Sequence, residues 1–476
     1  MNSSGQALYG WEDCLNLDIG TVQDMYRDYV NPGQVDLIGS FGFGRVLTKS
    51  ASGIRIVTED GREILDFTGG VGVLNHGHNH PRILEARKRF QNQLRMEVHK
   101  NFLSPYVAAL SHNIAQLLPE DLDISYFCNS GAEAVEGAVK LAYKYHGGKR
   151  KHILHADISF HGKLLGSAGL TGSTELYFKF PTIPDIGSFE YGSIESVKKS
   201  IDKYRSTSGE SDIYAIIIEP FNATTLRGCT TEFLKELRAI CTDNNIVLIF
   251  DEVYSCWAKT GELFHFMGHQ VVPDIVTMAK SMGGGKASIS GYTTRKPFFM
   301  QAYGSLHHSI IHSTTYNGFG EETITAIEAI NIAIEDDYVG RSKKIFDQLN
   351  GGLWKLKEKY PECISDVRGS GALNGIILND AVIPGLKQTL SFVPNEFFSD
   401  KCFMAKLLTA AFISELYNEH SILTFYGVNR EIPLIFSPSL ITEEKDINLL
   451  LQALDKTLAI GRLSLILKFA RFKFQK

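Results

Sequence analysis

Two stretches of the chain decide its fold: Ile246-Val-Leu-Ile-Phe-Asp251-Glu252 and Asp274-Ile-Val-Thr-Met-Ala-Lys280-Ser-Met-Gly-Gly-Gly285. Each is an apolar run that ends in a charged residue, Asp251 in the first and Lys280 in the second. The two charged residues are separated by about 30 residues, which is the length of one strand–helix–strand unit. In an open parallel sheet both side chains would emerge at the carboxyl edge, where such sheets bind ligands.

The surrounding sequence extends this pattern. Apolar runs alternate with helical stretches between residues 123 and 295, which predicts an α/β fold with a mainly parallel sheet covered by helices. The predicted strands are Ile124–Phe127, Ile153–Ala156, Tyr214–Glu219, Ile246–Asp251, Ile275–Met278 and Ile289–Thr294. Beyond them, the periodicity predicts helices over Glu322–Glu335, Arg341–Tyr360, Phe403–Tyr417 and Glu443–Leu458, with a strand over Ala372–Leu378 and an irregular stretch to about Pro394. Residues 1–60 are expected to form an N-terminal arm and a short strand over Gly53–Glu59.

The composition excludes several classes of protein. The chain has 476 residues, 44% of them hydrophobic, and a net charge of −5, which is typical of a soluble globular protein without a nucleic-acid surface. We see no signal peptide and no apolar run near the roughly 20 residues of a spanning helix. Seven cysteines without framework spacing suit a reducing compartment, so we expect a cytoplasmic protein. The basic, apolar tail Arg462–Lys476 could touch a membrane surface, but a terminal element packed on its own domain is the favoured interpretation.

Lys280 and Asp251 together suggest a particular cofactor. A buried lysine amine can form a Schiff base with an aldehyde, and a carboxylate facing a pyridine nitrogen keeps that ring protonated and electron-withdrawing. These two requirements point to pyridoxal phosphate. Taken singly, a solvated loop lysine and an acid that caps a helix are the more probable interpretations. Their joint placement favours the cofactor.

Three further motifs bear on this choice. Asn129-Ser130-Gly131-Ala132-Glu133 follows a predicted strand and opens a helix, which suits either a phosphate site or plain N-capping. In Ser159-Phe160-His161-Gly162 the aromatic side chain could stack on a planar ring or belong to the core. The hydroxyls of His312-Ser-Thr-Thr315-Tyr-Asn-Gly318 could reach a phosphate or form a polar turn.

In this order and spacing the motifs resemble the class III (ω-amino) pyridoxal-phosphate-dependent aminotransferases, which have fold type I. The resemblance runs from roughly Val30 to Leu458, and it includes Leu65-Asp-Phe-Thr-Gly-Gly-Val-Gly72 and Gly77-His-Asn-His-Pro81. Met25-Tyr-Arg-Asp-Tyr-Val-Asn-Pro-Gly33 and the run Phe127-Cys-Asn-Ser-Gly131 look most like the putrescine and acetylornithine type of aminotransferase.

The resemblance implies a domain organisation. A large domain with a mainly parallel sheet would bind the cofactor, and the N- and C-terminal segments would form a smaller α/β domain. We expect residues 1–70 to be the N-terminal arm and part of the small domain, 71–325 the large domain, and 326–476 the C-terminal small domain.

The same resemblance implies a role for each matching residue. Lys280 would form the Schiff base and move protons, and Asp251 would pair with the pyridine nitrogen. Thr315 would reach the phosphate bound by a neighbouring subunit, which implies a homodimer. The other implied cofactor-binding residues are Ser130, Gly131 and Ala132 at the phosphate, Phe160 on the ring, and His161, Glu219, Val253 and Tyr254 nearby. His76, His78 and His80 alternate as metal ligands sometimes do, but the family uses this run as a structural turn, so no metal is expected.

The departures from the family pattern concern substrate recognition. After Glu219-Pro220 the family usually has Gln-Gly-Glu-Gly-Gly, whereas this chain has Phe221-Asn-Ala-Thr-Thr-Leu-Arg-Gly228. Tyr254 stands in place of a glutamine and Lys259 in place of an arginine. Ile435 occupies the position of an arginine that binds the substrate α-carboxylate, and losing it removes a bidentate fork. Arg227 and Arg430 are the candidates to replace that arginine.

We therefore expect transamination between a primary amine or ω-amino compound and an oxo acid or aldehyde, which would suit a specialised biosynthetic pathway. Two alternatives stay open. An aminomutase or racemase would use the same fold and lysine, because fold does not determine function. A catalytically altered homologue could keep the cofactor for interaction or regulation.

Overall fold

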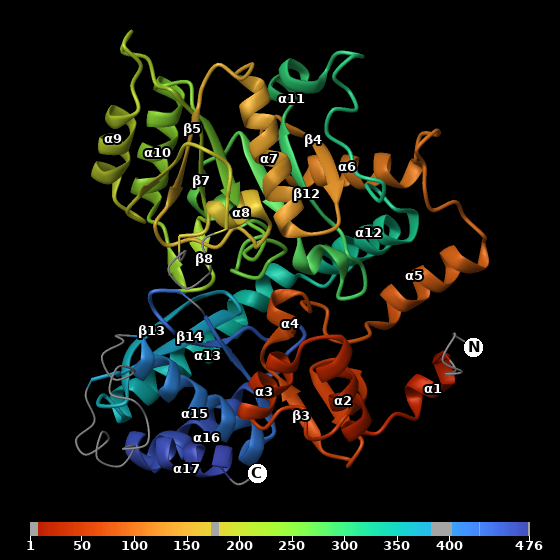
Figure 1. The fold of residues 1–476 in the computed structure, drawn as a ribbon, viewed down its shortest axis with the longest axis vertical. Helices are drawn as coiled ribbons and strands as arrows, with labels where there is room; N and C mark the ends of the chain where they lie inside the picture. The colour runs from red at the N-terminus through yellow and green to blue at the C-terminus, as the bar shows by residue number, and fades with distance from the viewer. Residues whose placement is uncertain (1–7, 173–179, 382–401, 428, 475–476) are drawn as a thin grey trace.

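A computed structural model describes residues 8–172, 180–381, 402–427 and 429–474 of the chain (Figure 1). Its centre is a seven-stranded sheet in the order β4-β12-β11-β10-β7-β5-β6. The strands are β4 (Leu122–Cys128), β5 (His152–Ala156), β6 (Ile186–Phe189), β7 (Ile213–Ile218), β10 (Val247–Asp251), β11 (Ile275–Met278) and β12 (Ser290–Arg295). β12 runs antiparallel to both its neighbours, β4 and β11, and the other pairs are parallel. The six predicted strands are confirmed, with ends that differ by at most two residues; β6 was not predicted.

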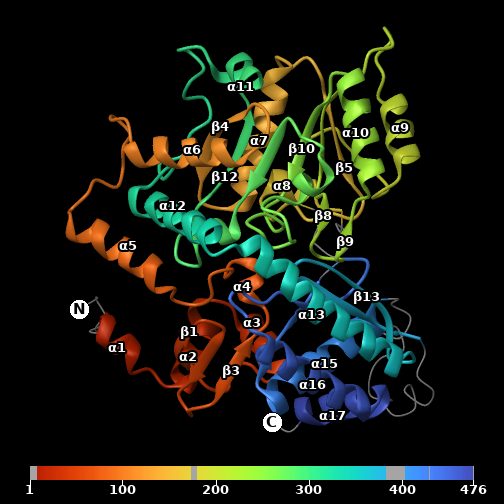
Figure 2. The ribbon, with the colours of Figure 1, turned by 180° about the vertical axis from the view of Figure 1, so that it is seen from behind.

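Helices cover both faces of this sheet (Figures 1 and 2). On one face α7 (Gly131–Tyr145) and α11 (Lys296–Tyr303) pack against Ala215, Ile217, Val247 and Ile249. On the other face, Ile216, Ile218, Leu248 and Phe250 meet α6 (Pro105–Leu117), α9 (Ile194–Lys203), α10 (Thr231–Asp243) and α12 (Gly320–Glu335). Because successive strand residues point to opposite faces, a strand buried on both must be apolar throughout, as β7 and β10 are.

Below this sheet in Figure 1, segments from both ends of the chain share a second core. One sheet joins β1 (Thr48–Ser52), β2 (Arg55–Thr58) and β3 (Glu63–Asp66) to β15 (Ile422–Leu423). Another has the order β13-β14-β17-β16, with β13 (Ile364–Ser370), β14 (Leu373–Leu378), β16 (Phe425–Tyr426) and β17 (Leu434–Phe436). The parallel pairing of β15 with β3 brings the two chain ends together, although the domain boundaries given above stay a prediction.

Helices surround the second core. They are α13 (Tyr338–Lys359), α15 (Phe403–His420), α16 (Glu444–Ile460) and α17 (Arg462–Phe474). The C-terminal tail is the helix α17, and its residues Leu465 and Ile466 are buried against its own domain, as favoured from the sequence. Among the described residues, no helix is long and apolar enough to cross a membrane.

The N-terminal region differs from the expected arm. Residues 11–40 form three helices, α1 (Trp11–Leu15), α2 (Ile19–Tyr29) and α3 (Pro32–Ser40). Asp18 caps α2 by accepting from Thr21 N at 2.9 Å, and Asn31 caps α3, which begins with a proline. Both are ordinary helix-start signals, and they were visible in the sequence. The end of the predicted irregular stretch falls in residues 382–401, outside the described part of the chain.

Candidate active site

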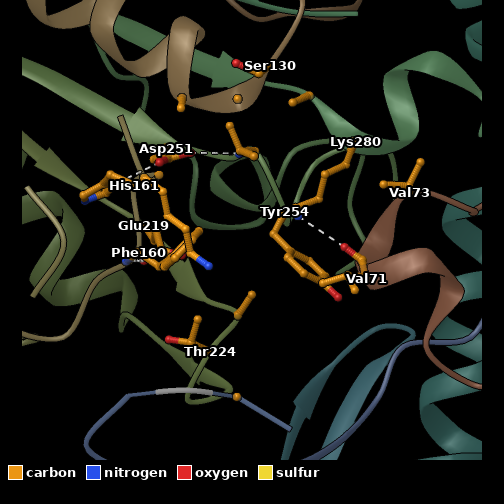
Figure 3. A pocket seen from close by; sticks show the side chains of 18 of the residues that line it. Val71, Val73, Ser130, Phe160, His161, Glu219, Thr224, Asp251, Tyr254 and Lys280 are labelled. Carbon is orange, nitrogen blue, oxygen red and sulfur yellow. Dashed lines mark hydrogen bonds and ion pairs between the residues drawn. The ribbon is translucent and has the colours of Figure 1, made fainter. Parts of the chain in front are cut away.

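The carboxyl edge of the large sheet opens into a cavity of about 530 Å³ (Figure 3). The cavity lies between this edge and strands β16 and β17 of the second core. Every predicted site residue except Thr315 lines it. These residues are Ser130, Gly131, Ala132, Phe160, His161, Glu219, Asp251, Val253, Tyr254 and Lys280.

Lys280 leaves β11 at the start of a short 3-10 helix, with a positive φ of 51°. A left-handed backbone is uncommon for a residue with a side chain, and such strain gathers at functional sites. The Lys280 Nζ atom donates to Val71 O at 3.2 Å and lies 4.5 Å from the centre of the Tyr254 ring. Desolvation lowers the pKa of this amine, against the opposing effect of the Asp251 charge. The neutral, nucleophilic form of the amine is therefore favoured relative to an exposed lysine.

Asp251 ends β10, and its side chain is buried. Its Oδ2 atom lies 2.6 Å from His161 Nδ1. Its Oδ1 atom accepts from Thr277 Oγ1 at 2.9 Å and from Val253 N at 3.0 Å. A carboxylate only accepts hydrogen bonds, so His161 must carry its proton on Nδ1. Three donors thus hold the ionised carboxylate in one orientation at the wall of the cavity.

The N-terminus of α7 forms another wall. Ser130 caps the helix by accepting from Glu133 N at 3.3 Å, so the N-capping interpretation is confirmed. Capping leaves backbone N–H groups of the first turn without partners inside the helix, and these groups suit a phosphate. A Cβ atom on Gly131 would lie 2.8 Å from Val253 Cγ1, so only glycine fits between this helix and the loop after β10.

The wall opposite the sheet edge is apolar. Ile435 in β17 is buried and lines the cavity together with Phe425, Tyr426 and Ala223. Ile435, Ala223 and Phe425 share a small core with Phe221 and Leu373. Among the described residues that line this wall, none is a lysine or an arginine.

Neither candidate arginine restores the missing fork. Arg227 makes a bidentate pair with Glu431 at 3.0 and 2.6 Å, and Arg430 Nη1 donates to Asp157 Oδ2 at 2.7 Å. Neither residue lines the cavity, and among the described residues no arginine does.

Lys259 is fully buried outside the cavity. Its Nζ atom donates to Pro438 O at 2.8 Å, just beyond β17, and desolvation lowers its pKa to about 7. In addition, Tyr254 Oη donates to Ser437 Oγ at 3.3 Å. The replacements at 254 and 259 therefore both contact the segment that follows Ile435.

The sequence did not reveal the part played by Asn222. The run Phe221–Gly228 was interpreted only as a departure from the family, but it forms a hairpin of β8 (Phe221–Asn222) and β9 (Arg227–Gly228). Asn222 is fully buried, and its Nδ2 atom donates to Glu219 Oε2 at 2.6 Å. Asn222 followed by Thr224 and Thr225 is typical of a turn in which an asparagine side chain bonds the backbone, which is the signal that could have revealed it.

Thr315 lies apart from the other predicted residues. It is exposed, and it does not line the cavity of its own chain. The Lys100 Nζ atom contacts Thr314 O and Asn317 Oδ1, which lie on either side of Thr315 along the chain. The expectation that Thr315 serves a partner subunit stays a prediction.

Residues 42–458 match the model of a family described as aminotransferase class III. The chain belongs to the class III aminotransferase family. It is therefore a pyridoxal-phosphate-dependent aminotransferase.

Solved structures share its fold. A transaminase from the marine bacterium Virgibacillus has 22% identity and a TM-score of 0.76, over 90% of this chain and 94% of that chain. The ornithine aminotransferase of Toxoplasma gondii, whose structure has partial occupancy of pyridoxal phosphate at the active site, has 20% identity and a TM-score of 0.77, over 97% and 98%. A structure of this enzyme from strain ME49 has 21% identity and a TM-score of 0.77, over 94% and 97%.

The cavity fits pyridoxal phosphate on its own geometry. Gly131 and Ala132 in the first turn of α7 line the cavity, so this turn can present N–H groups to the phosphate. The buried Asp251 carboxylate suits a pyridinium nitrogen, and the Lys280 amine suits the aldehyde. The observed residues thus supply partners for the phosphate, the pyridine nitrogen and the aldehyde of the cofactor.

Two of the three alternating histidines bond to different groups. His76 Nε2 lies 2.9 Å from Ala329 O, and His78 Nε2 lies 2.9 Å from Asp66 Oδ2. In the described ranges, no group of three or more His, Cys, Asp or Glu side chains could hold a metal ion.

Proposed function

We propose that this enzyme transaminates a primary amine or ω-amino compound whose carboxylate is absent or remote, with an oxo acid or aldehyde as the acceptor. The observation that carries the proposal is the apolar wall around Ile435, together with the engagement of Arg227 and Arg430 by Glu431 and Asp157. Burying a carboxylate against such a wall without a donor is costly. An amine with an apolar body would instead be desolvated favourably there.

The residues at the cavity suggest how the reaction proceeds. When bound, pyridoxal phosphate supplies an aldehyde carbon that condenses with amines and a ring that withdraws electrons. We assign Lys280 to hold the cofactor, and its freed amine to take a proton from the substrate carbon and return one as general base and acid. The lowered pKa of this amine suits the task. Asp251 would hold the pyridine proton, and the N–H groups of Gly131 and Ala132, with Ser130, would orient the phosphate.

We also infer a homodimer in which Thr315 completes the cofactor site of the partner subunit. Supporting this, the loop between α11 and α12, which carries Thr315, exposes Leu306 and Ile310 at 87% and 78%. The segment it contacts through Lys100 exposes Phe102 and Leu103 at 66% and 98%. Exposed apolar side chains gathered in this way mark interaction sites. None of the seven cysteines, all within the described residues, lies in a disulfide, which supports the expected cytoplasmic location.

A half-reaction screen tests the proposal. Each candidate amine is added alone to the holoenzyme, and conversion of the bound cofactor to its aminated form is followed spectroscopically. We expect simple amines to convert the bound cofactor faster than α-amino dicarboxylates. In the reverse half-reaction, started from the aminated cofactor, apolar aldehydes should react faster than α-oxo dicarboxylates. Without the bidentate arginine, partners with an α-carboxylate should be weakened by roughly tenfold to a hundredfold, because hydrogen bonds between charged groups contribute about 1.5–3 kcal/mol.

The variant Ile435→Arg is the matched test of the wall, since it should shift the preference towards 2-oxoglutarate. A clear preference of the natural enzyme for glutamate and 2-oxoglutarate would contradict the proposed substrate class. Turnover of an amine without accumulation of the aminated cofactor would instead favour an aminomutase or racemase.

A further inference from the structure

The two carboxylate oxygens of Glu219 differ in their hydrogen bonds. The residue follows β7, is buried, and lines the cavity beside Lys280 and Asp251 (Figure 3). Its Oε2 atom accepts from Phe160 N at 2.8 Å and from Asn222 Nδ2 at 2.6 Å. Its Oε1 atom has no hydrogen-bond partner among the described residues, yet it is not one of the fully buried orphan atoms. Oε1 is therefore the oxygen that a molecule in the cavity can reach.

The orientation of Asn222 is fixed by its own contacts. The Oδ1 atom accepts from Thr225 N at 2.9 Å, from Thr225 Oγ1 at 2.7 Å and from Thr224 Oγ1 at 2.9 Å. A backbone N–H can only donate, so the oxygen of the amide must face Thr225. The NH₂ group must then face Glu219, which makes Asn222 an obligatory donor to Oε2.

Glu219 has no salt-bridge partner among the described residues, and burial raises its pKa to about 7. The other ionisable groups that line the cavity near it are Lys163, Lys280, the Asp251 carboxylate and the His161 ring bound to it. A substrate carboxylate would be repelled here, whereas a hydrogen-bond donor would find a free acceptor.

We propose that Glu219 is a specificity-determining residue that selects amines with a second hydrogen-bond donor, a hydroxyl or another amino group, within reach of Oε1. Asn222 is its positioning residue. This inference rests on the proposed function and narrows its substrate class. The surrounding wall is apolar at Ala223, Phe425 and Ile435, so a polar group elsewhere on the substrate would lack a partner there.

The isosteric variant Glu219→Gln provides a sharp test. The N–H of Phe160 and the NH₂ of Asn222 both donate, so the glutamine oxygen must face them and its NH₂ must face the cavity. The acceptor then becomes a donor. An amino alcohol, a plain alkylamine and a methoxy-alkylamine of matched length are compared in the half-reaction. In the natural enzyme we expect the half-reaction to be faster with the amino alcohol than with the alkylamine by roughly tenfold to a hundredfold. In Glu219→Gln the methoxy compound should overtake the amino alcohol.

A second variant tests whether Asn222 orients the side chain at position 219. In Glu219→Gln with Asn222→Ala one of the two donors is gone, so the amide can turn and the inverted ranking should collapse. The spectrum of the bound cofactor and the unfolding temperature establish that this protein folds. Calorimetric binding to the Lys280→Ala protein, in which no reaction follows, should give the same rankings as the half-reactions.

The outcomes distinguish this inference from the proposed function. If no amine aminates the cofactor, the proposed function fails. If amines react but the natural enzyme does not distinguish the amino alcohol from the alkylamine, or if Glu219→Gln keeps the original ranking, the assignment of Glu219 is overturned while transamination stands.

Discussion

At the scale of single residues, the pairing of Asp251 with His161 is the most consequential contact. The variant Asp251→Asn should still bind the cofactor, but it should slow the half-reaction by roughly a hundredfold or more, because a neutral amide does not hold a pyridinium proton. Stopped-flow spectroscopy with amine alone measures this rate. The control is Asp274→Asn, a buried aspartate paired with Arg238 away from the cavity. An unchanged rate in Asp251→Asn would remove Asp251 from this role.

Lys259 predicts a pH dependence of stability. Burial lowers its pKa in the folded state from 10.5 to about 7. Between these two values the unfolded chain binds more protons at this residue, so its contribution to stability rises with pH. Lys259→Met should remove this rise, on the order of a few kcal/mol, without changing the response of other groups. Urea unfolding of both proteins at about pH 7 and at pH 10.5 gives the change in the free energy of unfolding between the two pH values. An equal change in the two proteins would show that Lys259 titrates normally.

Residues at strand ends could be predicted, and residues defined by distant contacts could not. Asp251 and Lys280 follow from the rule that the carboxyl edge of a parallel sheet gathers side chains. The roles of Asn222 and Lys259 do not follow from this rule. Asn222 acts through the orientation of one amide, and Lys259 contacts Pro438, a residue far along the chain. The absence of Arg227 and Arg430 from the cavity likewise depends on their partners Glu431 and Asp157.

At the scale of elements, the start of α7 carries a testable constraint. In Gly131→Ala the added Cβ would lie 2.8 Å from Val253 Cγ1, so the first turn of the helix must shift. Its N–H groups would then no longer point at the phosphate. Cofactor affinity should fall by about tenfold or more, at tenfold per 1.4 kcal/mol. The control is Gly351→Ala in α13, where nothing lies within 4 Å of the new Cβ atom. Equal affinities in a cofactor titration of the two variants would contradict the constraint.

The elements themselves were predicted best where burial is two-sided. The strands β7, β10 and β11 are largely apolar runs because helices cover both faces of the sheet, and the polar exceptions Thr277 and Asp251 lie at the site. The N-terminal helices α2 and α3 bury no residue fully, and they were missed although their capping residues Asp18 and Asn31 stand in the sequence. The hairpin of β8 and β9 is too short to show any periodicity.

At the scale of the whole molecule, the proposed dimer joins assembly to catalysis. Sedimentation should give about twice 52.9 kDa. Leu103→Glu with Ile310→Glu should dissociate the dimer and weaken cofactor binding, because charges would replace exposed apolar contacts and Thr315 would leave the partner's site. The control is Leu449→Glu on α16, which is 47% exposed. A natural enzyme that is monomeric with full cofactor affinity would refute the contribution of Thr315.

The central claim is that Lys280 binds the cofactor covalently and moves protons in transamination. Its most direct test is reduction of the holoenzyme with borohydride, followed by peptide mass spectrometry. The account predicts one cofactor per chain, attached to the peptide that contains Lys280. In Lys280→Ala it predicts no attachment, no absorption from a lysine-bound cofactor and no turnover. Attachment to another lysine such as Lys259 or Lys286, or steady-state transamination by Lys280→Ala near the original rate, would contradict it.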